Sequence, residues 1–476
     1  MNSETKPQGQ LVRSLGLVSV FFLVASSVIG SGVYKKVAPM AEAMQSPSLV
    51  LLAWALGGVL TLFGTLSNAE VASMLADSGG EFVYYRKIYN RFFAFLYGWA
   101  NFTAIRSASI ASIAYVFAQS FNSLVPLPVL SEGLSSITVF GFLTPFDNFG
   151  VKVFTIALII GLTYINYVGL KTGGGFSKAI LYVVIATILM IVILGFIIGD
   201  GSWHNITTDA TGFVSQSWTD SVFIKSLFAA LLGAFWAYEG WSTIGYLGGE
   251  IKNAQRNLPL GLIFGMLFVM AIYLCINFTY LYVMPIDELL ADSKSTNTIA
   301  AVTVMKHLLG NGGALFMSLL ILLTTLGTTN TTILAAPRLY FAMAKEGLFF
   351  KGAAEIHPKH NTPSKAFLFQ AVIVSLLVIS GSFDQLTDML IFASFIFYGA
   401  TALGVFVLRV KMPDTPRPYK AWGYPVVPAI FILFCVALLI ITFASKTREA
   451  TMGLVLITTG VPFYFYWNRN SKKKEK

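Results

Sequence analysis

The chain has 476 residues, of which 56% are hydrophobic and only 11% are charged. Soluble domains carry about 25% charged residues, so this composition excludes an ordinary soluble protein and indicates an integral membrane protein. The formal net charge is +10, but the basic residues gather between apolar runs, so we expect them to set membrane topology and not to bind nucleic acid.

The apolar runs are continuous and do not alternate, which favours membrane-spanning helices over a β-barrel. About twenty apolar residues cross a bilayer, and the sequence contains twelve candidate spans. They centre near Val28, Leu60, Phe102, Ile160, Ile188, Gly233, Ala271, Leu326, Val374, Phe397, Phe434 and Val455. With both termini placed in the cytoplasm, most Lys and Arg residues fall on the inner side, as the positive-inside rule requires. We therefore expect an all-α, multi-pass membrane protein with both termini cytoplasmic.

The first span is interrupted at its middle by Gly30-Ser31-Gly32. Gly and Ser weaken a helix at a depth where lipid cannot satisfy free N–H and C=O groups, so the break must be shielded or must line a cavity. A second interrupted span lies far downstream, at residues 235–241, with Glu239-Gly240 at its break. Two broken helices in corresponding halves of a polytopic chain indicate a transporter whose solute binds at the breaks.

The first ten spans divide into two sets of five, each beginning with a broken span. An odd number of spans per half inserts the second half upside down, which predicts an inverted repeat. We expect a cytoplasmic tail over residues 1–13, a first repeat over 14–200 and a second over 221–410. Two extra spans would cover 426–468, and a basic cytoplasmic tail would cover 469–476.

The ends of broken helices can bind a zwitterion without any ionised side chain, because they expose N–H groups on one side and carbonyls on the other. A carboxylate would contact the N–H groups of Ser31, Gly32 and Val33, where glycine permits close approach. An ammonium group would contact carbonyls near Ser27, Val28 and Trp236. The alternative is that these small residues only allow helices to pack closely.

Several polar side chains within the spans have more than one interpretation. Glu239 would cost at least ~2.5 kcal/mol at mid-membrane, so it titrates for proton coupling, contacts a substrate amine or pairs with another buried group. Arg106 favours a structural ion pair over a substrate contact, and Glu70 is expected at a solvated helix end. Thr328 and Thr331 belong to a threonine-rich run whose hydroxyls either bond to their own helix or coordinate Na⁺.

No cofactor or metal site is expected, apart from a coupling Na⁺ or H⁺. Cys275 and Cys435 both lie within apolar spans, which leaves no disulfide framework or metal cluster. The spans also carry no clustered His, Cys or paired carboxylates, which argues against an enzyme.

A series of distinct motifs lies along the chain between about residue 14 and residue 430. They are Ile29-Gly-Ser-Gly-Val33, Gly98-Trp-Ala-Asn-Phe102 with Arg106, Ala237-Tyr-Glu-Gly-Trp241, Glu250-Ile-Lys-Asn-Ala-Gln-Arg-Asn-Leu-Pro259, Pro337-Arg-Leu-Tyr-Phe-Ala-Met-Ala-Lys-Glu-Gly347, His357-Pro-Lys-His-Asn-Thr-Pro363, Arg417-Pro-Tyr419 and Gly423-Tyr-Pro425. With these motifs the chain resembles the amino acid–polyamine–organocation transporters, and within them the L-type amino acid transporter branch.

The resemblance implies a LeuT-type fold of twelve transmembrane helices, with a 5+5 inverted repeat, two extra helices and breaks in helices 1 and 6. It also implies alternating access about a central site, with spans 1, 2, 6 and 7 rocking against a scaffold. The aromatic gate would be Trp236, with Phe235 as the neighbour to test. The implied substrate-binding residues are Val28, Ile29, Gly30, Ser31, Gly32, Val33, Trp236 and Glu239, and the coupling candidates are Glu239, Thr328 and Thr331.

Two departures from the family pattern bear on coupling and partners. Many relatives carry a lysine in the fifth span in place of a sodium site, whereas Val184 falls at that position here. Sodium, a proton on Glu239 and plain exchange therefore stay open. Animal members use a loop cysteine after span three to bond a heavy chain, and this chain has none there. We therefore expect no disulfide-linked heavy chain, which suits a bacterial inner membrane.

The sequence thus predicts a secondary active transporter of amino acids, either an exchanger or a symporter, whose partners are its substrate and membrane lipid. One alternative is a polyamine or cationic amino-acid carrier in which Glu239 is the cation partner. Another is an amino-acid sensor built on the same fold.

Overall fold

The computed structural model describes residues 13, 15–75, 80–139, 143–168, 173–198, 201–293, 299–357 and 362–472. Most of the expected N-terminal tail and the last residues of the basic tail lie outside the described residues. Within the described residues the secondary structure is helical, apart from isolated β-bridges between Leu15 and Ile251 and between Val139 and Leu143. The all-α prediction is therefore confirmed.

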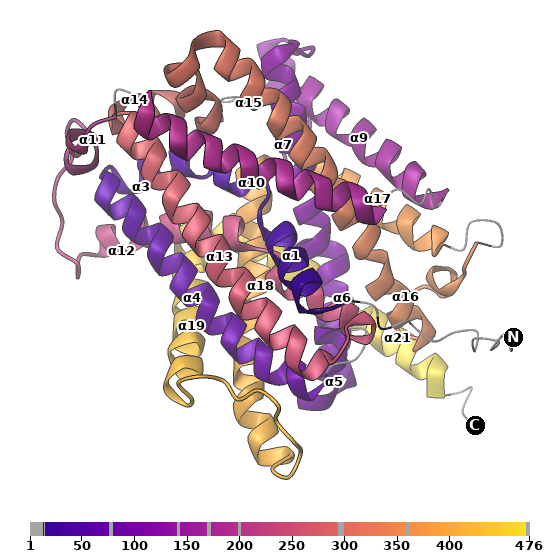
Figure 1. The fold of residues 1–476 in the computed structure, drawn as a ribbon. Coiled ribbons are helices and arrows are strands. Elements are labelled where there is room, and N and C mark those ends of the chain that lie inside the picture. Colours follow the sequence, from indigo (N-terminus) through magenta and orange to yellow (C-terminus); the bar gives the residue numbers. More distant parts are fainter. Residues whose placement is uncertain are drawn as a thin grey trace, which may run out of the picture.

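The helices follow one another along the chain, joined by connections of varied length (Figure 1). The first half contains α1 (Leu17–Val28), α2 (Gly32–Lys35), α3 (Val37–Met44), α4 (Pro47–Met74), α5 (Glu81–Ile88), α6 (Arg91–Ala100), the π-helical turn η1 (Asn101–Ile105), α7 (Arg106–Leu124), α8 (Glu132–Ser135), α9 (Phe149–Tyr167), α10 (Gly173–Ile197) and α11 (Trp203–Thr207). The second half contains α12 (Ser221–Tyr238), the 3₁₀ segment η2 (Trp241–Glu250), α13 (Ala254–Val283), α14 (Ile286–Ser293), α15 (Ala300–Ala335), α16 (Pro337–Lys345), the 3₁₀ turn η3 (Lys351–Ala354), α17 (Ser364–Ser380), α18 (Phe383–Lys411), α19 (Val426–Ser445), α20 (Thr447–Thr458) and α21 (Gly460–Lys472).

Among the described residues, eight helical stretches are long and apolar enough to cross a membrane. They are Pro47–Met74, Phe149–Tyr167, Ser221–Glu250, Ala254–Val283, Ala300–Lys345, Phe383–Lys411, Val426–Ser445 and Thr447–Arg469. Three shorter apolar helices cover Leu17–Val28, Tyr182–Ile197 and Ser364–Ser380. The molecule is therefore a multi-pass helical membrane protein.

Both predicted helix breaks are confirmed. Helix α1 ends at Val28, Ile29 takes an extended conformation (φ −71°, ψ 98°), and the chain becomes helical again at Gly32. Helix α12 ends at Tyr238, Glu239 is extended (φ −66°, ψ 150°), and Gly240 takes a left-handed conformation with φ 109°. A Cβ atom on Gly240 would lie 2.3 Å from the carbonyl oxygen of Ser27. Backbone conformation and packing therefore both require glycine at the second break.

The two broken spans lie against each other inside the molecule. A Cβ atom on Gly32 would meet the Cα atom of Ala237 at 2.5 Å, so the start of α2 and the end of α12 are in backbone contact. Helix α13 packs along α1 and α4, and Figure 1 shows α1 in the middle of the molecule with α13 beside it. The first break is thus packed between longer helices.

The prediction that Glu70 lies at a solvated helix end is wrong. Glu70 is only 1% exposed, and both its carboxylate oxygens accept hydrogen bonds from Arg409 of α18, at 2.9 Å from Nε and 2.7 Å from Nη2. The backbone N–H of Ala421 donates to the same carboxylate at 2.6 Å, and the guanidinium stacks over the Tyr424 ring at 3.5 Å. The connector between α18 and α19 therefore folds back over the end of α4 and buries this pair.

Candidate functional site

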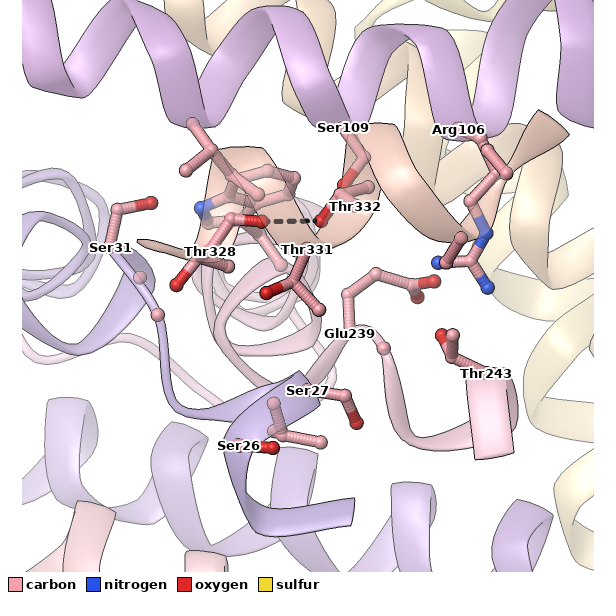
Figure 2. Close-up of a pocket in the computed structure, with 18 of the residues that line it drawn as sticks. Ser26, Ser27, Ser31, Arg106, Ser109, Glu239, Thr243, Thr328, Thr331 and Thr332 are labelled. Carbon is pink, nitrogen blue, oxygen red and sulfur yellow. Dashed lines mark hydrogen bonds between the residues drawn. The ribbon is translucent and has the colours of Figure 1, made fainter. Parts of the chain in front are cut away.

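A cavity of about 80 Å³ lies between the two breaks, which is room for several water molecules or a small solute. Its walls come from α1, α7, α12, η2, α15 and α16 (Figure 2). The predicted residues that line it are Val28, Gly30, Ser31, Gly32, Trp236, Glu239, Thr328 and Thr331. The lining therefore brings together residues that are some 300 positions apart in the chain.

Three residues of the predicted set lie elsewhere. Ile29 and Val33 are buried in the core and do not line the cavity. Phe235 packs against Phe395 at 4.6 Å and Phe434 at 5.4 Å between ring centroids. For Phe235 the helical turn explains the difference, since neighbouring residues on α12 point about 100° apart, and of Phe235 and Trp236 only Trp236 lines the cavity.

Hydroxyl groups from α1 and α15 line the cavity, and most of them donate their proton back to their own helix. Ser27 donates to the carbonyl of Val24 at 2.8 Å, Thr328 to that of Thr324 at 2.9 Å, and Thr331 to that of Gly327 at 2.9 Å. This is the usual behaviour of such residues in helices. A hydroxyl that has donated its proton keeps lone pairs, so this wall offers acceptors to a cationic group.

Two other cavity residues carry donors that are still free. The Ser31 hydroxyl and the Trp236 indole N–H are buried and have no hydrogen-bond partner among the described residues. A buried polar group without a partner costs about 1–3 kcal/mol, so each is expected to bind a ligand group. Donors at Ser31 and acceptors on α15 give the cavity the polarity that a zwitterion needs.

The charged residues of the cavity face each other. Figure 2 shows the Glu239 carboxylate pointing toward the Arg106 guanidinium, with Thr243 beside them. The Tyr398 hydroxyl donates to Glu239 Oε1 at 2.8 Å. Arg106 follows the π-helical turn η1 directly, and such a turn shifts the direction of the residues after it. Glu239 therefore already has a neutral donor and an opposite charge nearby.

On one side of the cavity, Trp236 belongs to a stack of side chains. The Trp236 ring meets Phe383 edge to face at 5.9 Å, and the ammonium groups of Lys35 and Lys36 lie 4.2 Å and 4.6 Å from the Phe383 ring centroid. Lys36 Nζ also lies 2.7 Å from Asp384 Oδ1. The lining also includes the small residues Ala335, which ends α15, and Ala336, which precedes α16.

The match of the whole chain to known proteins agrees with this geometry. Residues 15–465 match the family model described as amino acid permease. The chain belongs to the amino acid permease family. It is therefore a membrane transporter of amino acids and not an enzyme, and the resemblance to amino acid–polyamine–organocation transporters is confirmed.

The permease is similar to transporters from bacteria and animals over nearly its whole length. It is 30% identical to the serine/threonine exchanger SteT of Bacillus subtilis (strain 168), over 96% of this chain and 97% of the relative. It is 28% identical to the human b(0,+)-type amino acid transporter 1, over 98% of this chain and 90% of the relative. It is 29% identical to the mouse large neutral amino acids transporter small subunit 2, over 99% and 86% respectively.

Several residues that line the cavity were not predicted. Ser109, Thr243, Tyr246 and Thr332 also line the cavity, but a serine or tyrosine in an apolar span has no sequence signal that separates lining from packing. Tyr246 leads to a buried polar chain: its hydroxyl lies 2.6 Å from that of Tyr97, which donates to Glu81 Oε2 at 3.2 Å. Glu81 belongs to α5, outside the membrane-spanning stretches, and burial raises the pKa of its carboxyl.

Proposed function

We propose that this permease transports small neutral amino acids across the cell inner membrane by alternating access. The observation that carries the proposal is the polarity of the cavity. The buried Ser31 hydroxyl has no partner among the described residues, and the hydroxyl oxygens of Thr328 and Thr331 line the cavity with their protons turned to their own helix. An α-carboxylate would bind at Ser31 and the N–H groups that open α2, since the first N–H groups of a helix have no intrahelical partner.

The charges of the cavity favour a neutral side chain over a cationic one. The Glu239 carboxylate accepts a hydrogen bond from Tyr398 and faces Arg106 (Figure 2), so a second cation is not needed to balance it. A cation entering the cavity would also meet the Arg106 charge. The bacterial relative is named a serine/threonine exchanger, and a cavity of about 80 Å³ suits small substrates.

The proposed architecture has twelve spans. It counts the eight long stretches and the three shorter apolar helices, together with the continuous helical run α6–η1–α7. The two inverted repeats would cover residues 14–200 and 221–410, with both termini in the cytoplasm. In that orientation the stack of Trp236, Phe383 and Lys36 closes the outer side, so the molecule would be in a state that faces the cytoplasm, with Trp236 as the gate.

Coupling has three candidate forms, and one experiment separates them. Purified permease in proteoliposomes is given radiolabelled serine, threonine, leucine, lysine and putrescine, with vesicles either empty or preloaded with unlabelled serine. Uptake that requires internal serine indicates exchange. Uptake into empty vesicles that requires sodium indicates sodium coupling, for which Thr328 and Thr331 are the candidate ligands. Uptake driven by a pH gradient indicates proton coupling, for which Glu239 is the candidate group.

Two serine-to-alanine variants test the proposed substrate site. Ser31→Ala removes the free hydroxyl, and Ser26→Ala removes a cavity hydroxyl that already donates to the carbonyl of Leu23 at 3.0 Å. We expect the apparent KM for serine to rise about tenfold in the first variant and about twofold or less in the second. Transport of lysine or putrescine in preference to serine would refute the substrate class and leave the family assignment in place.

A further inference from the structure

Glu81 is a buried carboxylate that lies outside the cavity. It is the first residue of α5, directly after Gly80 with its positive φ of 52°, and only 1% of it is exposed. The Tyr97 hydroxyl donates to its Oε2 at 3.2 Å, whereas Oε1 is buried without a hydrogen-bond partner among the described residues. Burying a carboxylate with one free oxygen is costly, so a role in transport would explain why the chain carries one here.

A chain of hydroxyl groups joins Glu81 to the wall of the cavity. Tyr97 of α6 lies between Glu81 and Tyr246, and the two tyrosine hydroxyls are 2.6 Å apart. Of the three residues only Tyr246 lines the cavity. When Tyr97 donates to Glu81, Tyr246 must donate to Tyr97, because each hydroxyl carries one proton. A charged acceptor at the end of such a chain strengthens its bonds, so the carboxylate fixes the Tyr246 hydroxyl from a distance.

The backbone beside Glu81 holds the same tyrosine. A Cβ atom on Gly80 would lie 2.8 Å from the Tyr246 ring and 3.2 Å from the carbonyl carbon of Gly245. Both Gly245 and Tyr246 belong to η2, the segment that follows the second break. Helix α5 itself packs against α6 and α18. The start of α5 therefore holds η2 against these two helices.

The position of Tyr246 matters because its ring supports a charge of the cavity. Arg106 lines the cavity (Figure 2), and its guanidinium carbon lies 5.8 Å from the centroid of the Tyr246 ring. The Arg106 Nε is buried without a hydrogen-bond partner among the described residues. A cation over an aromatic face is attracted to the ring, and more strongly where water is excluded. Displacement of the Tyr246 ring would therefore move the Arg106 charge.

We propose that Glu81 is a positioning residue for the substrate site, which acts through Tyr97 to hold Tyr246, and with it Arg106, in the cavity wall. This inference rests on the proposed substrate site. Because Glu81 does not touch the cavity, its effect on a bound solute passes through the tyrosine chain. Loss of its charge should therefore weaken substrate binding and leave the rate at saturation nearly unchanged.

The proposal predicts a pH dependence of definite sign. Burial raises the pKa of the Glu81 carboxyl, while the Arg106 charge and the Tyr97 hydrogen bond oppose that rise. The charged form is present above this pKa and is lost as the pH falls through it, so substrate affinity should fall on the acid side. The groups that face Glu81 are Tyr84 and Tyr85 of α5, Tyr97 of α6, Tyr246 of η2, Arg106 of α7 and Glu239 after α12. Tyrosine and arginine titrate only near or above about pH 10, so among these Glu239 alone could produce a similar profile.

The first arm of the test measures serine exchange in proteoliposomes at a series of pH values, with equal pH on both sides so that no proton gradient contributes. We expect the wild-type KM to rise several-fold toward acid pH. Glu81→Gln keeps the shape of the side chain without its charge, so its KM should equal the acid value of the wild type at every pH, with Vmax within about twofold. Tyr97→Phe cuts the chain and leaves the carboxylate, and its KM should be raised about tenfold at every pH.

Glu346→Gln is the matched control. It removes a partly exposed carboxylate that lies 2.5 Å from Arg86, and it should keep the wild-type profile. A wild-type KM that does not change with pH, or a profile that persists in Glu81→Gln or in Tyr97→Phe, would overturn the proposal. A persistent profile would assign the pH dependence to Glu239, which is intact in all three variants. If Glu81→Gln does not fold, Tyr97→Phe decides between these outcomes.

The second arm needs no substrate. Hydrogen–deuterium exchange of the full-length variants, followed by mass spectrometry, reports local opening of the backbone. At the alkaline end of the series we expect Glu81→Gln and Tyr97→Phe to exchange faster than wild type in peptides that cover residues 241–250, with α9 and α19 unchanged. Glu346→Gln should exchange as wild type. Unchanged exchange in this segment would refute the action of Glu81 through Tyr246. If the wild type does not transport serine, the proposed substrate class fails, and this arm still decides whether Glu81 holds η2.

Discussion

Gly32→Ala is the substitution that most directly tests contact between the breaks. A Cβ atom on Gly32 would lie 2.5 Å from Ala237 Cα and 2.8 Å from Ala237 Cβ. Neither neighbour is the end of a flexible side chain, so neither can rotate away. Carbon atoms in ordinary contact lie about 3.5–4.0 Å apart, and the two broken spans would therefore have to separate by about 1 Å.

The size of the effect follows from that separation. An extra methyl group in a well-packed interior costs about 1–3 kcal/mol, and a displacement of about 1 Å at a site can cost about 10²-fold in rate. We expect Vmax/KM for serine in Gly32→Ala proteoliposomes to fall about a hundredfold, with KM carrying most of the change.

Gly30→Ala is the matched control in the same segment. The nearest atoms to a Cβ on Gly30 are Thr328 Cγ2 and the carbonyl oxygen of Val28, each at 3.8 Å, so the methyl group fits without displacement. Gly30 also lines the cavity, so some loss of Vmax/KM is expected, but it should be several-fold smaller than in Gly32→Ala because the methyl group meets no clash. Equal losses in Gly30→Ala and Gly32→Ala, or full activity in Gly32→Ala, would refute the reasoning from close contact.

Three further changes test other parts of the fold. Glu70→Gln leaves the Arg409 guanidinium without its carboxylate partner. We expect the free energy of unfolding, measured by thermal unfolding in detergent, to fall by about 2 kcal/mol, because Arg409 is only partly buried. Lys36→Met removes the ammonium that lies 2.7 Å from Asp384, so a cysteine introduced in the cavity wall should react faster with an impermeant maleimide applied from outside. Trp236→Ala removes the ring between the cavity and the outer stack, and KM for serine should rise about tenfold, as for a lost anchor residue.

Each of these expectations has a clear contrary result. An unfolding temperature of Glu70→Gln equal to wild type would mean that the buried pair adds nothing to stability. Unchanged maleimide labelling in Lys36→Met would show that its contact with Asp384 does not hold the outer side closed. An unchanged KM in Trp236→Ala, with a raised KM in Phe235→Ala, would move the gate to the neighbouring residue.

Much of this protein follows from local sequence. The apolar runs determine that it is a helical membrane protein, because lipid leaves no other partner for the backbone than the helix itself. The breaks at residues 30–32 and 239–240 were also predictable, since Gly and Ser weaken a helix wherever they cluster. Membrane spans and helix breaks both depend on residues that are neighbours in the chain, so they can be read from the sequence directly.

Contacts between distant segments were decided only by the tertiary structure. Glu70 was expected to be solvated and instead binds Arg409 and Ala421, because a connector some 340 residues away folds over it. Phe235 and Trp236 are neighbours in sequence, and only the rotation of α12 directs Phe235 toward α18 and α19 and Trp236 toward the cavity. Glu81 reads as an ordinary acidic residue between two spans until α5 is packed against α6 and η2. The sequence by itself determined where the helices break, and packing determined which side chains meet there, because side-chain direction depends on how the helices are rotated and not on residue type.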